Sequence, residues 1–344
     1  MNLSLIWVLV QFFVCAAAVS VAGYRLAVEG ERIGQAWGLT GSWVGLAMLA
    51  SVTSLPELLT GVSAVTLAHS PNIALGDALG SCVINLGFLV VVDFVLRDEP
   101  LYRKTSASHL LSGAFGVVML GFVAMNILLA GTPGFSHPAV DGVGLYSPVI
   151  VLLYLVALRL VFQHERRRPS SPAEAAQPHE GAARQSSVWQ SLGRFMLSAL
   201  VVAAAGVWLP VAGAQLADAL QWNRSFIGTL FIALTTSLPE LAVTLSAIKL
   251  RALDMAVGNL LGSNLFNVVI IAIDDVAYRQ GVLLAHVSPL HAVTALSAVV
   301  MTGLAMIGLF YRPQSRVLRT VGWVSIALAA VYLFNTYTVF LYGA

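Results

Sequence analysis

The sequence predicts an all-α integral membrane protein with ten transmembrane helices in two inverted-topology repeats of five helices. Hydrophobic residues make up 58% of the 344 residues and charged residues only 10%, whereas soluble domains carry roughly 25% charged residues. At about 20 apolar residues per helical span, the roughly 200 hydrophobic residues would fill about ten spans. The apolar runs are long and continuous, which excludes the alternating pattern of a membrane β-barrel.

The individual spans follow from the continuous apolar runs, taken in chain order. They are predicted at 3–23, 38–67, 73–96, 107–130, 145–163, 191–214, 223–248, 254–277, 286–310 and 318–341. The first run has no basic residue before it and no clear cleavage site, so we interpret it as a retained span rather than a signal peptide. Residues 164–190 are polar and rich in Pro, Ala and Ser, which is typical of a flexible linker between two membrane halves.

The distribution of Lys and Arg sets the predicted orientation. If the 164–190 linker is cytoplasmic, sixteen of the eighteen Lys and Arg residues fall on the inner side, and only Arg224 and Arg279 fall outside. This asymmetry agrees with the positive-inside rule and places both termini outside. The excess of Arg over Lys and the abundance of Ala indicate a GC-rich bacterial source. We predict a multi-pass protein of the bacterial inner membrane. A net charge of +2 is too small to suggest a nucleic-acid partner.

Two polar motifs occur twice in the chain. TSLPELLTGVSAV at 53–65 matches TSLPELAVTLSAI at 236–248, and ALGDALGSCVINL at 74–86 matches AVGNLLGSNLFNV at 256–268. Each pair lies in the second and third spans of a five-span half. Because five is odd, the halves enter the membrane in opposite senses, a construction typical of secondary transporters with a midplane binding site. The predicted units are a first half (1–163), the linker (164–190) and a second half (191–344).

The repeated TSLPE motif places one glutamate deep inside an apolar run in each half. A charged side chain at the bilayer centre costs about 2.5–3.5 kcal/mol on insertion scales, and no Lys or Arg lies at the depth of Glu57 or Glu240. A bound cation, or a proton, would supply the missing positive charge. Pro56 and Pro239 remove a backbone donor beside each glutamate, which frees the carbonyl groups of residues 52 and 235.

Hydroxyl and amide side chains accompany the two glutamates at helical spacing. Thr53, Ser54, Thr236 and Ser237 share a helix face with the glutamates. In the second motif, Ser81 and Asn85, like Ser263 and Asn267, are four residues apart. The donor set is therefore all oxygen, which favours Na⁺, Ca²⁺ or Mg²⁺ over zinc and copper. Two carboxylates in a crowded site suit Ca²⁺, which accepts 6–8 oxygens at irregular geometry.

The paired TSLPE and GSxxxN segments resemble the two α-repeats of the sodium/calcium exchanger family, within the cation/calcium antiporter superfamily. The resemblance is strong over about 39–96 and 224–277. It implies a ten-helix inverted-repeat fold in which the first and sixth spans slide as gating helices against a core. It also implies four cation sites, exchange of Ca²⁺ for Na⁺ as transported ions, and no organic cofactor.

The resemblance further implies a role for each matching residue. Glu57 and Glu240 would hold Ca²⁺ and share the Na⁺ sites, and carbonyls near Thr53 and Thr236 would complete the Ca²⁺ shell. The residues implied to line the Na⁺ sites are Ala50, Ser54, Ser81, Ala233, Ser237 and Ser263. Asn85 and Asn267 would lie centrally.

Three departures from the family pattern bear on the chemistry. Some members carry an acid where this chain has Asn267, and in potassium-dependent relatives that acid is tied to K⁺. The second repeat has the family's GN and GSN sequences, whereas the first has Asp77 and Cys82 at the equivalent positions. Asp77, Ser81 and Asn85 share one side of their helix, and we hypothesise that Asp77 is a third carboxylate near an entrance to the site. Packing or helix capping is the alternative explanation for Asp77.

Other functions fit the residues less well. Ca²⁺/H⁺ exchange on the same fold remains the nearest alternative, which a requirement for Na⁺ would exclude. An intramembrane hydrolase would need a nucleophile–base pair or an HExxH motif in a span, and neither occurs, so we predict that the protein is not an enzyme. A sensor or scaffold has no need for two buried glutamates at repeated positions, and the inverted repeat favours alternating access over a channel.

Overall fold

The structure is a computed structural model that describes residues 3–36, 50–96, 101–166, 185–249, 252–313, 316–317 and 321–342. Helices dominate these residues. In the first part of the chain they are α1 (Leu3–Ala36), α3 (Leu55–Thr66), α4 (Pro71–Val95), α5 (Leu101–Lys104), α6 (His109–Ala130) and α7 (Tyr146–Arg166). In the second part they are α9 (Gln185–Leu220), α10 (Arg224–Phe226), π-helix η1 (Ile227–Ile232), α11 (Ala233–Thr236), α12 (Leu238–Lys249), α13 (Leu253–Ala277), 3₁₀-helix η2 (Leu283–Ala285), α14 (His291–Tyr311) and α15 (Trp323–Tyr342).

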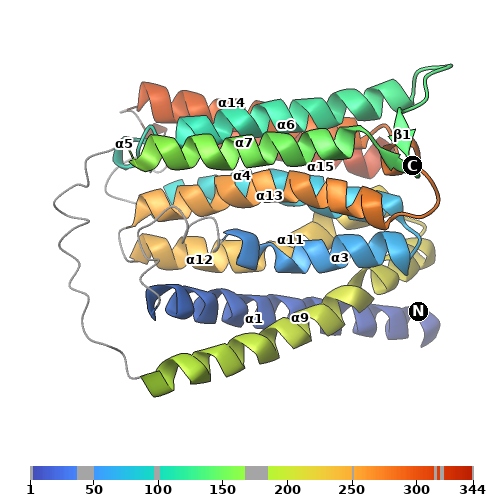
Figure 1. Cartoon of the computed structure of the whole chain (residues 1–344), viewed down its shortest axis with the longest axis horizontal. Helices are drawn as coiled ribbons and strands as arrows, with labels where there is room; N and C mark the ends of the chain where they lie inside the picture. Colours follow the sequence, from blue (N-terminus) through green and yellow to red (C-terminus); the bar gives the residue numbers. More distant parts are fainter. Residues whose placement is uncertain are drawn as a thin grey trace.

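The long helices run side by side in layers (Figure 1). α1 and α9 form one outer layer, and α3 and α10–α12 lie beneath them. α4 and α13 form the next layer, and α6, α7, α14 and α15 cover its far side. In their most apolar stretches, 72% of α4 and 78% of α13 is buried, against 22% of α1 and of α7. The two helices that carry the GSxxxN motifs are therefore the centre of the bundle.

The predicted spans are largely confirmed, with two corrections. Within the described residues, eight helices are long and apolar enough to cross a membrane, and the bent pair Arg224–Thr236 and Leu238–Lys249 makes a ninth. Part of the remaining predicted span, 38–67, falls outside the described residues, so the count of ten stays a prediction. α1 and α9 are longer than predicted, because amphipathic turns extend each apolar run. Helix also extends into the predicted linker at both ends, to Arg166 and from Gln185, and the rest of that linker lies outside the described residues.

The first residues of α1 and the last residues of α15 lie at the same end of the molecule (Figure 1). This arrangement agrees with the prediction that both termini face one side of the membrane. Two short antiparallel hairpins, which the sequence did not predict, precede α7 and α15. They are β1 (Ala139–Val140) with β2 (Val143–Gly144), and β3 (Arg316–Val317) with β4 (Val321–Gly322).

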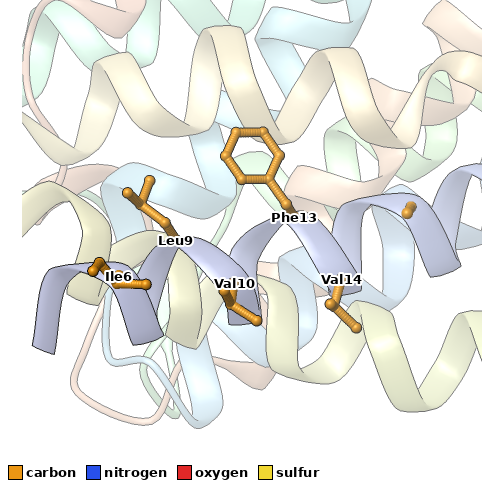
Figure 2. Close-up of a pocket in the computed structure, with 6 residues that line it drawn as sticks. Ile6, Leu9, Val10, Phe13 and Val14 are labelled. Atoms are coloured by element: carbon orange, nitrogen blue, oxygen red, sulfur yellow. The ribbon is translucent and has the colours of Figure 1, made fainter. Parts of the chain in front are cut away.

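The outer face of α1 is an apolar surface of the kind that lipid covers. Trp7, Phe13 and Val14 are among its exposed side chains. Figure 2 shows a shallow groove of about 370 Å³ on this helix, lined by Ile6, Leu9, Val10, Phe13, Val14 and Ala17. Large apolar side chains that point outward fit a helix in a bilayer, and the groove offers no polar atom to a cation.

A buried aspartate at the end of α4 holds the hairpin before α15. Asp93 Oδ2 accepts hydrogen bonds from the Gly322 amide at 2.8 Å and the Ser325 hydroxyl at 2.7 Å. Its Oδ1 accepts one from the Leu101 amide at 3.2 Å. The carboxylate thus satisfies donors that water cannot reach, as buried polar groups require.

The repeat-related aspartate of α13 does the same for the hairpin before α7. Asp275 accepts from the Gly144 amide at 2.9 Å, the Ser147 hydroxyl at 2.6 Å, the Tyr146 hydroxyl at 2.6 Å and the Leu283 amide at 2.8 Å. Asp93 and Asp275 are 182 residues apart, the same offset as the GSxxxN motifs. The internal repeat therefore extends to the ends of the central helices.

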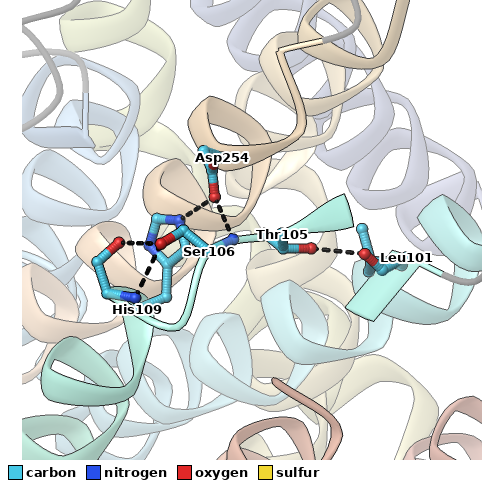
Figure 3. A network of polar contacts seen from close by, with 6 residues as sticks. Leu101, Thr105, Ser106, His109 and Asp254 are labelled. Atoms are coloured by element: carbon cyan, nitrogen blue, oxygen red, sulfur yellow. Dashed lines mark hydrogen bonds and ion pairs between the residues drawn. The ribbon is translucent and has the colours of Figure 1, made fainter. Parts of the chain in front are cut away.

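The opposite end of α13 is anchored by a third polar network (Figure 3). Asp254 Oδ1 lies 3.0 Å from His109 Nε2 and accepts the Ser106 amide at 2.7 Å. Thr105 donates to the Leu101 carbonyl at 2.6 Å, which closes the short turn between α5 and α6. Both ends of α13 are thus fixed to neighbouring segments by a carboxylate.

We expect Asp275→Ala to destabilise the protein by about 3 kcal/mol or more, because it strands four buried donors of which each costs roughly 1–3 kcal/mol when unsatisfied. Asp218→Ala is the control, since Asp218 is 64% exposed and forms only a surface ion pair with Arg224, worth about 0–1 kcal/mol. Thermal unfolding of both variants in detergent checks this. Equal unfolding temperatures for the two variants would contradict the role of Asp275.

Candidate cation site

Both TSLPE motifs interrupt their helices at the serine. Ser54 has φ −88° and ψ 11° before α3, and Ser237 has φ −82° and ψ 0° before α12. This region of backbone conformation is sparsely populated and common at functional sites. In the second repeat the interruption bends the span by 42°. The proline that follows lies in the first turn of the next helix, where its missing N–H is tolerated.

The two interruptions face each other and exchange hydrogen bonds. Ser54 Oγ donates to Glu240 Oε1 at 3.1 Å, and Ser237 Oγ donates to Glu57 Oε1 at 3.3 Å. All four side chains have no exposed surface. Each glutamate stands in the first turn of its helix, where the helix dipole favours negative charge. The repeat thus folds into a reciprocal pair of carboxylates at the centre of the bundle.

The polar stripes of α4 and α13 border this pair. Thr53 Oγ1 lies 3.3 Å from Ser263 Oγ, and Ser81 Oγ donates to the Ala233 carbonyl at 3.5 Å. Asn85 Nδ2 donates to Asn264 Oδ1 at 3.0 Å. Hydroxyl and amide groups from four segments therefore surround one buried polar centre.

All twelve residues predicted for the site are at least 97% buried. They are Ala50, Thr53, Ser54, Glu57, Ser81, Asn85, Ala233, Thr236, Ser237, Glu240, Ser263 and Asn267. Hydrogen bonds connect most of them, but neither amide atom of Asn267 has a hydrogen-bond partner. Their role as cation ligands remains a proposal.

Asp77 lies at this centre as well. Its Oδ1 accepts a hydrogen bond from Thr236 Oγ1 at 2.9 Å, while its Oδ2 has no partner. It is 1% exposed. A helix-capping role is excluded, because Asp77 lies six residues inside α4, which begins at Pro71.

The sequence analysis did not assign two further polar residues of this region. Asn264 joins α13 to α4 by donating to the Cys82 carbonyl at 3.1 Å, in addition to accepting from Asn85. Asn259, at the position equivalent to Asp77, is fully buried with no hydrogen bond to either amide atom. The GN and GSN sequences of the second repeat were the signal that marked them.

The centre contains three carboxyl groups with free acceptor atoms and no basic partner among the described residues. No Lys or Arg is among the buried side chains of the described residues. Glu57 Oε2, Glu240 Oε2 and Asp77 Oδ2 accept no hydrogen bond. Within the described ranges no three His, Cys, Asp or Glu side chains are grouped to hold a metal ion. A cation here would therefore depend on hydroxyl, amide and carbonyl oxygens besides the carboxylates, as hard cations do.

Close helix packing delivers these groups to the centre. A methyl group on Gly80 would lie 2.5 Å from the Thr229 carbonyl oxygen, and one on Gly76 would lie 2.8 Å from the Thr229 amide nitrogen. Thr229 belongs to η1, where the widened π-helix turn directly precedes α11. Such π segments are frequent at functional sites. The two glycines, spaced four residues apart, thus let α4 touch the backbone of η1, as small residues do at close helix contacts.

α1 lies directly on both helix interruptions. A methyl group on Gly23 would lie 2.6 Å from Pro239 Cγ and 3.6 Å from Pro56 Cγ. Ser20 of α1 also donates to the Thr235 carbonyl at 3.4 Å, which Pro239 leaves without its helical partner. In α9 the equivalent glycine, Gly206, is more loosely packed, 3.9 Å from the Pro56 carbonyl by the same measure. The two outer helices therefore contact the site unequally.

These features define a multi-span membrane transport protein with a buried, oxygen-lined site between two repeated elements. The sequence model described as sodium/calcium exchanger protein matches residues 7–163 and 190–341. The chain therefore belongs to the sodium/calcium exchanger family, whose members are transporters.

Two curated relatives are membrane proteins. The chain is 30% identical over 243 residues to the uncharacterized membrane protein MJ0091 of Methanocaldococcus jannaschii, covering 69% of this chain and 71% of the relative. It is 29% identical over 257 residues to the inner membrane protein YrbG of Escherichia coli, covering 72% of each.

Two solved structures share the fold. The H⁺/Ca²⁺ exchanger CAX superposes with a TM-score of 0.71 at 14% identity, over 96% of this chain and 81% of that one. The sodium-calcium exchanger NCX_Mj superposes with a TM-score of 0.59 at 23% identity, over 97% of this chain and 99% of that one. At these identities the likeness shows the fold alone.

Gly80→Ala should destabilise the site, because the added methyl meets the Thr229 carbonyl and overpacking of this kind costs roughly 1–3 kcal/mol. Gly121→Ala in α6 is the matched control, since nothing lies within 4 Å of its added methyl. Unfolding temperature and Ca²⁺ uptake by reconstituted protein measure the effect. If both variants behaved like the wild type, the close contact of α4 with η1 would be refuted.

Proposed function

We propose that this protein is a secondary active antiporter that exchanges Ca²⁺ for Na⁺ across the membrane by alternating access. The observation that carries the proposal is the reciprocal pair of glutamates. Glu57 and Glu240 are fully buried at facing helix interruptions, each with one unpartnered carboxylate oxygen, and no buried Lys or Arg of the described residues neutralises them. Two carboxylates balance one Ca²⁺ or partly balance several Na⁺, so a site of this kind is costly to leave empty.

The surrounding oxygens divide into two groups in this proposal. The carbonyls beside Thr53 and Thr236 complete the Ca²⁺ shell with the two glutamates. The hydroxyls of Ser54, Ser81, Ser237 and Ser263, with the Ala50 and Ala233 backbone, line the Na⁺ positions, and Asn85 and Asn267 lie between them. Because one set of carboxylates serves both ions, occupancy by Ca²⁺ and by Na⁺ is mutually exclusive, and exchange follows.

α1 and α9 are the moving parts of the proposed cycle. They form one layer against the rest of the bundle (Figure 1), and α1 covers both interruptions through Gly23 and Ser20. Sliding this layer would open the site to one side of the membrane and then to the other. The unequal packing of α1 and α9 supports access from one side at a time.

Ca²⁺/H⁺ exchange is the second candidate, and Asp77 is the observation that favours it. A third buried carboxylate raises the negative charge of the centre, which protons as well as Na⁺ could balance. The coupling ion is decided by comparing Ca²⁺ uptake under a Na⁺ gradient with uptake under a pH gradient alone.

We expect Na⁺-loaded vesicles containing the protein to take up ⁴⁵Ca²⁺ on dilution into Na⁺-free buffer, and the Glu57→Gln, Glu240→Gln double variant to fall to background. The amides preserve shape but remove both charges. The surface variant Asp218→Asn serves as the control and should transport normally. Uptake that persists in the double variant would show that the glutamates do not hold Ca²⁺, and uptake driven only by a pH gradient would select the proton-coupled candidate.

Asp77→Asn gives the first repeat the residue that the second repeat has at position 259. We expect roughly tenfold weaker apparent Ca²⁺ affinity, equivalent to about 1.4 kcal/mol, because a carboxylate beside Thr236 and the glutamates is lost. The Ca²⁺ concentration dependence of uptake measures it. Unchanged affinity, ion preference and pH dependence would assign Asp77 a packing role only.

A further inference from the structure

A second buried carboxylate on α13 lies outside the cation site. Asp274 has no exposed surface, and neither of its carboxylate oxygens has a hydrogen-bond partner. Its neighbour Asp275 instead receives four hydrogen bonds. Asp274 lies seven residues after Asn267, about 10 Å farther along the helix axis. Neither the hairpin nor the proposed cation ligands use it.

Asp274 is packed against the backbone of α3. A methyl group on Gly61 would lie 2.5 Å from Asp274 Oδ2 and 2.8 Å from Oδ1. Gly61 stands one helical turn after Glu57. A change in the size or charge of the Asp274 carboxyl group therefore acts directly on α3, the helix that carries Glu57.

The contact breaks the internal repeat. The residue equivalent to Asp274 in the first half is Val92, and the residue equivalent to Gly61 in the second half is Thr244. In the described contact a carboxyl group, that of Asp274, packs against a glycine, Gly61. The equivalent positions of the other pair hold Val92 and Thr244. Two departures from the repeat meet at one contact, as expected if this carboxyl group has a role of its own.

Among the side chains that the structure describes, the titratable groups around Asp274 offer it no counter-charge. The titratable groups that interact electrostatically with the Asp274 carboxyl group are Asp77 of α4 and Asp275. Both are acids, so neither can act as a counter-charge. The other titratable side chains of the helices packed on α13 are Glu57 of α3, Cys82 and Asp93 of α4, His109 of α6, Tyr146, Tyr154, Arg159, His164, Glu165 and Arg166 of α7, and Glu240 and Lys249 of α12. Arg159 and Lys249 are exposed, and His109 bonds Asp254 at the far end of α13.

A metal ion does not fit this position. Ca²⁺ needs six to eight oxygens and Mg²⁺ about six, whereas no hydroxyl, amide or carboxylate donates to or shares a hydrogen bond with Asp274. Within the described residues no three-member group of metal-ligating side chains includes it. A proton needs only one oxygen, and it removes the charge that burial disfavours.

We propose that Asp274 is a proton-binding site, separate from the cation site, whose occupancy sets the packing of α3 and thereby the position of Glu57. The inference goes beyond the proposed function and does not depend on which ion is coupled to Ca²⁺. With the proton bound, the neutral carboxyl group packs against Gly61 as in this structure. When the proton leaves as pH rises, the carboxylate is repelled by Asp77 and the contact with α3 loosens.

The direct test is infrared pH-difference spectroscopy of the purified protein, which detects the C=O stretch of a buried protonated carboxyl group. We expect wild type to show a titrating band that Asp274→Asn lacks and that the control Asp218→Asn retains. Gly61→Ala, which keeps the carboxyl group but crowds it, should shift the band. Identical wild-type and Asp274→Asn spectra would overturn the proposal, and so would a band that Na⁺ or Ca²⁺ removes at constant pH. This readout decides the question even if the protein does not transport Ca²⁺.

Transport supplies the second readout, measured as isotopic Ca²⁺/Ca²⁺ exchange so that no coupling ion is needed. At low pH wild type and Asp274→Asn should exchange Ca²⁺ alike, because both are neutral at residue 274. As pH rises, wild type should fall behind the variant by up to about tenfold per pH unit, the limit for one linked proton. Asp274→Val, which copies the first half, should follow Asp274→Asn. Superimposable pH profiles would overturn the link between Asp274 and transport.

Discussion

The arrangement of the bundle depends on keeping two glutamates buried with no Lys or Arg of the described residues beside them. An isolated carboxylate in an apolar interior is among the most unfavourable groups a protein can contain. Here Glu57 and Glu240 are held by reciprocal serine hydrogen bonds across two helix interruptions. Those bonds exist only if the two interruptions face each other. They do so around α4 and α13 at the centre, where Gly76 and Gly80 of α4 pack against the backbone of η1.

The buried carboxyl groups of α3, α4, α12 and α13 fall into two classes with different surroundings. Asp93 and Asp275 are saturated by amide and hydroxyl donors and fix the loops at the ends of the central helices. Glu57, Glu240, Asp77 and Asp274 keep unpartnered oxygens. Both classes are buried, so burial alone does not distinguish them. The number of hydrogen-bond donors around each carboxyl group distinguishes the two classes.

The internal repeat makes the centre of the site nearly symmetric. The positions at which the two halves differ make the surroundings of the site unequal. The serine–glutamate bonds occur in both directions, whereas Asp77 faces Thr236 and its equivalent Asn259 has no partner. α1 is pressed onto Pro239 while α9 approaches Pro56 more loosely. In alternating access, one central site is exposed to each side of the membrane in turn. A symmetric centre with unequal surroundings suits such a cycle.

The sequence by itself determined the membrane class, nearly all the spans and the set of buried oxygen-bearing residues at the candidate site. Hydropathy is local and the repeated TSLPE and GSxxxN motifs are unmistakable, so no contact had to be known. The pairing of Ser54 with Glu240 and of Ser237 with Glu57, the hairpins fixed by Asp93 and Asp275, and the meeting of Asp274 with Gly61 were decided only by tertiary structure. These contacts join residues that are far apart in the sequence, from 131 positions for Gly144 and Asp275 to 229 positions for Gly322 and Asp93. Asp274 and Gly61 likewise lie in different helices. Residue order says nothing about which side of one helix meets another, because that depends on the packing of all the helices together.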